Sequence, residues 1–144
     1  MSAQPFFERE FSGTPEALSE VLESAVEALV AHDWAPGDKR FCARLCLEEA
    51  LVNAMVHGNQ NDPARKVRLE MSEEGNTCFI DVYDEGEGFN PALARVPDCQ
   101  TPGGRGVTLM KYYMDRVTYD RRRGCLEMVL RRTWPKGACK HEDA

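Results

Sequence analysis

The stretch Leu47-Glu48-Glu49-Ala50-Leu51-Val52-Asn53-Ala54-Met55-Val56-His57-Gly58 decides the fold of this chain. It consists of good helix formers with no proline and no internal glycine, and Gly58 is a typical residue just past a helix end. We therefore predict the C-terminal half of a helix that begins near Asp38, with the Asp38 side chain as its cap. Apolar residues occupy two sides of the helical wheel, so both sides are expected to be buried.

Glu49 and Asn53 are the polar exceptions on one of these apolar sides. They are four residues apart, so a helix places them on the same face. A carboxylate and an amide need partners there, because burying either group unpaired is costly. Glu48 lies four residues after Arg44 and is expected to face solvent and pair with that arginine. A buried Glu and Asn can also serve only to brace a helix, so these two residues alone do not define a function.

The composition is that of an ordinary globular protein. The 144 residues predict one domain, with a core at about residues 10–132 and a polar tail at 135–144. The net charge of −6 argues against direct binding of nucleic acid. The chain has neither an apolar run of about 18 residues nor a signal sequence, which favours a cytoplasmic protein without a membrane partner. The six cysteines include no CxxC pair, so we interpret them as reduced thiols.

The rest of the chain alternates between helical and strand patterns. Thr14, Pro15 and Glu16 combine a capping hydroxyl, a first-turn proline and a first-turn acid, which predicts a helix to about residue 33. The predicted strands are 6–11 at a sheet edge, 66–71, 78–84, 116–121 and 125–132, with turns at 74–76 and 122–124 and a third helix at 107–114. This order predicts an α+β fold: a two-layer sandwich in which three helices cover one face of a mixed, mainly antiparallel sheet.

An acidic residue ends the apolar face of the strand at 78–84. Asp84 is in phase with Cys78, Ile80 and Val82. It opens the sequence Asp84-Glu85-Gly86-Glu87-Gly88-Phe89, and Gly103-Gly104-Arg105-Gly106 later opens the third helix. The segment 85–103 between them has three prolines and no periodicity, and long loops of this kind in compact domains are usually functional. Each motif alone also fits a plain turn or loop, but their combination with Glu49 and Asn53 favours a functional site.

The phosphate and metal chemistry of these motifs favours nucleotide binding. Backbone N–H groups at a helix start opened by Gly104 and Gly106 bind phosphate, and Arg105 adds a fork of donors. The amide oxygen of Asn53 suits Mg²⁺, which keeps water and substrate phosphates as its other ligands.

The residues around Asp84 suit a purine base. A carboxylate at the rim of an apolar pocket can accept a hydrogen bond from the exocyclic amine of adenine, and Gly86 and Gly88 let the backbone approach the ring. The chain has no GxxxxGK[ST] motif, and its glycines do not follow the first strand of a βαβ unit. Walker-type and dinucleotide sites are therefore excluded.

Three motifs resemble those of the Bergerat-fold (GHKL) ATPases. Residues 49–58 are similar to the N box of that superfamily, Asp84-x-Gly86-x-Gly88-Phe89 to its first glycine box, and Gly104-Arg105-Gly106-Val107-Thr108-Leu109-Met110 to its second. The small size and the continuation through Asp115-x-Val117 resemble the anti-sigma-factor serine/threonine kinases. The resemblance covers about residues 10–132, and Thr108 departs from it where a third glycine is common.

The resemblance implies an ATP-dependent serine/threonine protein kinase that acts as an anti-sigma factor and phosphorylates an anti-sigma-factor antagonist protein. It assigns Glu49 as general base, Asn53 as the Mg²⁺ ligand and Asp84 as the adenine anchor. The further nucleotide contacts that it implies are Gly86, Gly88, Gly104, Arg105, Gly106, Val107 and Thr108, with residues 89–103 as a lid over the phosphates. A sigma factor is a second candidate partner, and a homodimer is the expected assembly.

Two other functions fit the same motifs. The first is an anti-sigma or adaptor module that uses ATP only as a structural ligand. The second is a free-standing histidine-kinase ATPase domain, which would transfer phosphate to a partner histidine. Glu49 beside Asn53 favours the serine/threonine kinase, because a module without catalysis needs no base.

Overall fold

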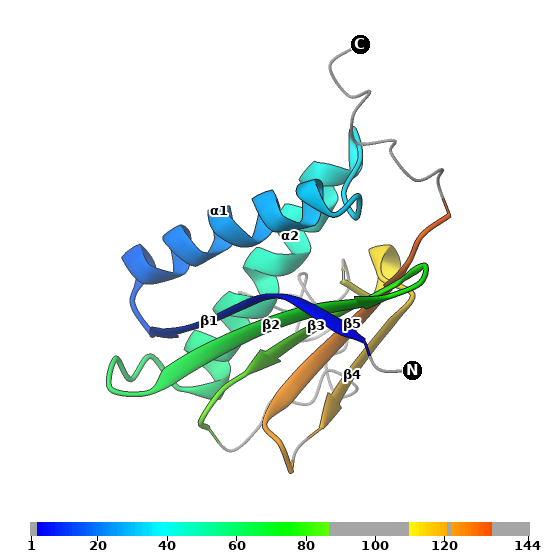
Figure 1. The fold of residues 1–144 in the computed structure, drawn as a ribbon. Coiled ribbons are helices and arrows are strands. Elements are labelled where there is room, and N and C mark those ends of the chain that lie inside the picture. The colour runs from blue at the N-terminus through cyan, green and yellow to red at the C-terminus, as the bar shows by residue number, and fades with distance from the viewer. Residues whose placement is uncertain (1–2, 87–109, 121, 134–144) are drawn as a thin grey trace.

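The computed structural model describes residues 3–86, 110–120 and 122–133, whose arrangement is drawn in Figure 1. In chain order the elements are β1 (Gln4–Ser12), α1 (Pro15–Ala31), α2 (Lys39–Val52), η1 (Asn53–Gly58), β2 (Lys66–Glu74), β3 (Thr77–Tyr83), β4 (Arg116–Asp120) and β5 (Cys125–Arg131). The segment η1 is π-helical. Residues 110–113 form a further helical turn.

The strands of the described residues form one sheet in the order β1-β2-β3-β5-β4. All four pairings between them are antiparallel. Helices α1 and α2 lie over the same face of this sheet (Figure 1), which confirms the predicted α+β sandwich. The sheet is antiparallel throughout the described strands rather than mixed, and β1 is an edge strand as predicted.

The start of α1 follows the predicted capping chemistry. Thr14 has an extended backbone, and its hydroxyl accepts a hydrogen bond of 3.2 Å from the N–H of Ala17. Pro15 occupies the first helical position, where its missing N–H is not needed. The helix ends at Ala31, close to the predicted residue 33.

The start of α2 corrects one prediction. The backbone of Asp38 is itself helical, with φ −70° and ψ −13°, and its side chain makes no capping hydrogen bond. A side chain caps a helix only when its own backbone is extended, so the predicted Asp38 cap is wrong. The helical path continues through Val52 into η1 and ends at Gly58, as predicted. None of the helices in the described residues is long and apolar enough to cross a membrane.

Only one side of α2 is fully buried. The residues that face the core are Ala43, Cys46, Leu47, Ala50 and Leu51. The stripe that carries Glu49 includes Cys46 and Asn53, which are buried, and Leu45, Val52 and Val56, which are half-buried. The expectation that both sides are buried is therefore met only in part among the described residues.

Ion pairs join α2 to α1 and correct a second prediction. Arg44 pairs with Glu23 of α1 rather than with Glu48. Arg40 approaches Glu27 of α1 at 3.7 Å. Glu48 is half-buried rather than fully exposed. The neighbouring helix offers Arg44 a carboxylate that the helical repeat of α2 alone does not reveal.

The core lies between the helices and the inner face of the sheet. Cross-strand partners on this face include Ile80 with Met128 and Val82 with Leu126. The members that the strand patterns predicted are buried: Val67, Leu69, Met71, Cys78, Ile80, Val82, Leu126, Met128 and Leu130. Val117 and Tyr119 of the edge strand β4 are half-buried against this core. Four cysteines of the described residues, Cys42, Cys46, Cys78 and Cys125, carry free thiols.

Candidate functional site

The side chain of Asn53 is buried without a hydrogen-bond partner in the described part of the chain. It begins η1, its exposed fraction is 1%, and neither its amide oxygen nor its amide nitrogen is paired. Leaving a buried polar group unpaired costs about 1–3 kcal/mol. Among the described residues, nothing occupies the hydrogen-bonding groups of this amide, and its oxygen is of the kind that a hard cation accepts as a ligand.

Glu49 lies one helical turn before Asn53. The carbonyl of Glu49 accepts from the backbone N–H of Asn53, so the helix is continuous between them and both side chains leave the same face. Burial raises the pKa of the Glu49 carboxyl, and the neighbouring Glu48 carboxylate raises it further. A carboxylate with a raised pKa holds a proton better, which suits a general base.

Asp84 directly follows β3 and is half-buried. Its Oδ1 accepts a hydrogen bond of 2.8 Å from the N–H of Gly86, and its own N–H donates to the carbonyl of Gly124 at 3.0 Å. Burial raises the pKa of the Asp84 carboxyl, whereas the Gly86 N–H and the charge of Arg65 act in the opposite direction. The bond from Gly86 uses one oxygen of this carboxylate, Oδ1.

The end of η1 and the turn after β3 are in direct contact. A Cβ atom on Gly58 would overlap the Asp84 carboxylate, and one on Gly86 would overlap the carbonyl of Gly58. Glycine is therefore required at both positions. The structure thus brings the helix of Glu49 and Asn53 against the turn of Asp84. Sequence reasoning explained Gly86 by close approach to a nucleotide, whereas here its α-carbon makes room for Gly58.

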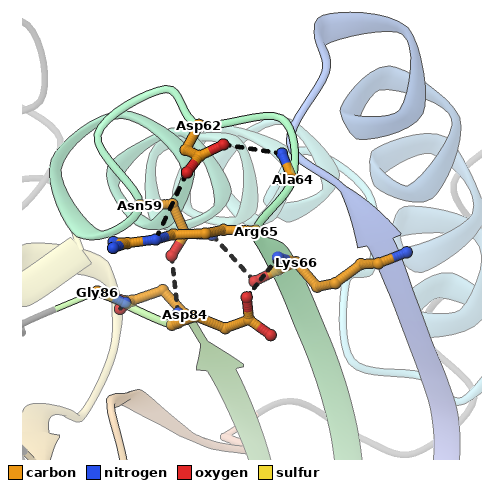
Figure 2. Close-up of polar contacts among 8 residues, drawn as sticks. Asn59, Asp62, Ala64, Arg65, Lys66, Asp84 and Gly86 are labelled. Atoms are coloured by element: carbon orange, nitrogen blue, oxygen red, sulfur yellow. Dashed lines mark hydrogen bonds and ion pairs between the residues drawn. The ribbon is translucent and has the colours of Figure 1, made fainter.

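Asn59 is a site residue that sequence reasoning missed. It follows η1 directly, is fully buried, and its side chain bonds to the turn after β3 (Figure 2). It belongs to none of the three motifs that predicted the nucleotide site. The one signal in the sequence was an asparagine immediately after the glycine that ends the helix.

The other predicted nucleotide contacts lie outside the described residues. These are Gly88, Gly104, Arg105, Gly106, Val107 and Thr108, together with the predicted lid at 89–103. Among the described residues, no three His, Cys, Asp or Glu side chains are grouped to hold a metal ion. A cation at Asn53 would therefore take most of its ligands from phosphate and water, as Mg²⁺ commonly does.

The fold and the site can be compared with a known family, the histidine kinase-like ATPase domain. The model of that family matches residues 11–132. This match covers most of the chain, which therefore belongs to the histidine kinase-like ATPase family.

Relatives within this family carry more specific names. The serine/threonine-protein kinase BtrW of Bordetella bronchiseptica is 32% identical over 116 residues, which are 73% of this chain and 78% of that protein. The anti-sigma F factor of Geobacillus kaustophilus is 32% identical over 99 residues, 64% of this chain and 67% of the relative. The anti-sigma F factor of Anoxybacillus flavithermus is 36% identical over 77 residues, and there the match spans 53% of the relative.

Proposed function

We propose that this chain is an ATP-dependent serine/threonine protein kinase that acts as an anti-sigma factor. Its substrate is a hydroxyl of an anti-sigma-factor antagonist protein, and a sigma factor is its second partner. The names of the relatives support this class of function. The observation that carries the proposal is the buried, unpaired amide of Asn53 beside the desolvated Glu49.

The proposed roles follow from the positions of the side chains. Asp84 accepts from the exocyclic amine of adenine and orients the nucleotide. Asn53 would hold Mg²⁺, which would supply neutralising charge at the phosphates. Glu49 accepts the proton of the attacking hydroxyl while the oxygen of that hydroxyl forms a bond to the γ-phosphorus. The bond from that phosphorus to the β,γ-bridging oxygen breaks, and ADP leaves.

The assembly and location are part of the same proposal. We infer a single kinase domain that forms a homodimer in the cytoplasm, without direct contact to nucleic acid or membrane. The competing functions share ATP binding, so phosphotransfer is the property that separates them.

The deciding experiment is transfer of radiolabel from γ-labelled ATP to the cognate antagonist protein, followed by acid treatment. The kinase proposal predicts an acid-stable phosphoprotein, because phosphoserine and phosphothreonine survive acid. Acid-labile label would instead identify a histidine kinase. ATP binding without any transfer would identify a non-catalytic anti-sigma or adaptor module.

A further inference from the structure

Asn59 uses its hydrogen-bonding groups to join three segments. Its side-chain Oδ1 accepts a bond of 2.7 Å from the N–H of Glu85, and its Nδ2 donates to the carbonyl of Lys66 at 2.9 Å. Its backbone N–H donates to the carbonyl of Ala54 at 2.8 Å, five residues earlier, and its carbonyl accepts from the N–H of Asp62. One buried residue therefore connects η1, the start of β2 and the turn after β3.

The amide is the one side chain of this size that satisfies both partners. An aspartate carboxylate at this position would offer no donor to the carbonyl of Lys66. An aliphatic side chain would leave the N–H of Glu85 without an acceptor as well. The link to β2 is doubled, because Glu85 Oε1 accepts from the N–H of Lys66 at 3.1 Å. Figure 2 shows Asn59 lying over the turn that carries Asp84 and Gly86.

The chain after Asn59 is bent to keep these contacts. Gln60 and Asn61 both have left-handed backbones, with φ 53° and φ 60°, which is unusual for residues other than glycine. Asp62 then accepts from the N–H of Ala64 at 2.9 Å. Strain of this kind persists only where the surrounding contacts fix the backbone. The turn after β3 is thus attached to a rigid neighbour.

We propose that Asn59 is a positioning residue that sets the base specificity of the site by holding the Asp84–Gly86 turn against η1. This inference rests on the proposed role of Asp84 in adenine recognition. Glu85 lies between Asp84 and Gly86, and the Asp84 carboxylate is itself bonded to Gly86. Loss of the Asn59 amide frees the N–H of Glu85, so the turn and the direction of the Asp84 carboxylate change together.

The test compares the binding of two nucleotides to the 144-residue chain by calorimetry in the presence of Mg²⁺. Inosine triphosphate carries the phosphates and ribose of ATP but lacks the exocyclic amine. Asn59→Ala is expected to weaken ATP binding by about tenfold or more, because the displaced Asp84 carboxylate would lose its charged hydrogen bond to the adenine amine. Its affinity for inosine triphosphate is expected to stay at the wild-type value.

A double-mutant cycle asks whether Asn59 acts through Asp84. In the Asp84→Asn background, Asn59→Ala is expected to produce no further loss of ATP affinity. Thr14→Ala is the control for lost stability, because it removes the cap of α1 but none of the hydrogen bonds of Asn59. That variant is expected to keep the wild-type preference for ATP over inosine triphosphate.

Each contrary outcome has its own meaning. Equal loss for both nucleotides, or additive effects in the cycle, would overturn the role of Asn59. An unchanged ATP affinity in Asp84→Asn would overturn the adenine assignment instead, and absence of ATP binding in the wild type would overturn the proposed function.

A second variant, Asn59→Asp, serves if Asn59→Ala does not fold. It keeps an acceptor for the N–H of Glu85 but loses the donor to the carbonyl of Lys66. It is expected to reduce the preference for ATP less strongly, and an unchanged preference would again overturn the proposal.

Discussion

The choice between two adjacent glutamates is made by the geometry of α2. At about 100° per residue, Glu49 lies about 40° from Asn53 and Glu48 about 140° from it. We therefore predict that Glu49→Gln keeps ATP affinity but loses phosphotransfer by roughly a hundredfold or more, the usual contribution of a general base. Glu48→Gln is the matched control. At pH values where the activity is maximal, it is expected to change neither the ATP affinity nor the rate of phosphotransfer by much. A radiolabel transfer assay measures both, and transfer by Glu49→Gln at the wild-type rate would refute the base assignment.

The pH dependence of phosphotransfer gives Glu48 a smaller, measurable effect. Glu49 must be deprotonated to accept a proton, and its pKa is raised by burial and by the Glu48 carboxylate. Activity is therefore expected to fall on the acid side at a higher pH than for an ordinary glutamate. Glu48→Gln removes one cause of the raised pKa, so the acid limb should move to lower pH. Coincident pH profiles for the two proteins would contradict this coupling.

Asp84 offers a separate test of nucleotide recognition. Its carboxylate keeps one oxygen free of the Gly86 N–H, and burial makes a hydrogen bond to that oxygen stronger. Asp84→Asn is expected to cost about 1–3 kcal/mol of ATP affinity, as for loss of a charged hydrogen bond. Isothermal titration of wild type and mutant measures the difference. Equal affinities would remove Asp84 from the proposed site.

At the scale of the element, the outer face of the sheet carries a row of acids. Glu70, Asp81 and Glu127 stand opposite one another on β2, β3 and β5. Burial is the main reason that the pKa of Asp81 is raised from 3.8 to about 6, followed by the Glu127 carboxylate, and Arg123 partly opposes both. The folded state therefore binds a proton that the unfolded chain has already lost in this pH range.

This row predicts how stability changes with pH. Because the pKa of Asp81 is higher in the folded state, its contribution weakens stability as pH rises from about 4 to about 6. Asp81→Asn should remove this slope and stabilise the protein at pH 7 by roughly 1 kcal/mol, allowing for solvent screening. Urea unfolding at several pH values measures it, with the exposed Glu20→Gln as control. A mutant with the wild-type slope would exclude Asp81 as its source.

At the scale of the whole molecule, a polar cluster closes the end of the sheet opposite the candidate site. Glu73 at the end of β2 accepts from the Trp34 indole at 2.6 Å, and its other oxygen lies 3.0 Å from His32 Nδ1. Arg132 lies 3.9 Å over the fully buried Trp34 ring and donates to the carbonyl of His32. Residues from β2, the connection between the helices and the end of β5 therefore meet in one place.

Substitution of Glu73 should lower the free energy of unfolding without changing the affinity for ATP. Glu73→Ala leaves the buried indole N–H unpaired and is expected to cost about 1–3 kcal/mol of unfolding free energy. Glu73→Gln retains an acceptor for that N–H and should cost less. ATP affinity is expected to stay unchanged in both, since the cluster lies at the other end of the strands. Denaturant unfolding followed by tryptophan fluorescence, together with calorimetry, measures both quantities; a weakened ATP affinity would show that the two ends are coupled.

Local sequence patterns predicted the helices and strands well, but they did not predict the contacts between these elements. The alternation in β2 and β3 and the Thr14 cap depend on neighbours in sequence, and the structure confirms them. The pairing of Arg44 with Glu23 depends on how α1 packs beside α2. The hydrogen bonds of Asn59 span 26 residues to Glu85, so no sequence spacing reveals them. The failed cap at Asp38 is a local effect instead, because the N–H groups of Lys39 and Arg40 bond to the carbonyls of Pro36 and Gly37 and the helical turn therefore begins before Asp38.

The contact between Gly58 and Gly86 limits how the proposed nucleotide pocket can be re-engineered. Kinases are often made sensitive to enlarged ATP analogues by trimming a bulky residue beside the adenine. Here the backbone of the helix end already touches the backbone of the turn, and neither residue has a side chain to remove. Extra volume for an N6-substituted analogue must therefore come from another wall of the pocket. The contact between Gly58 and Gly86 would stay unchanged in any variant designed to accept such an analogue.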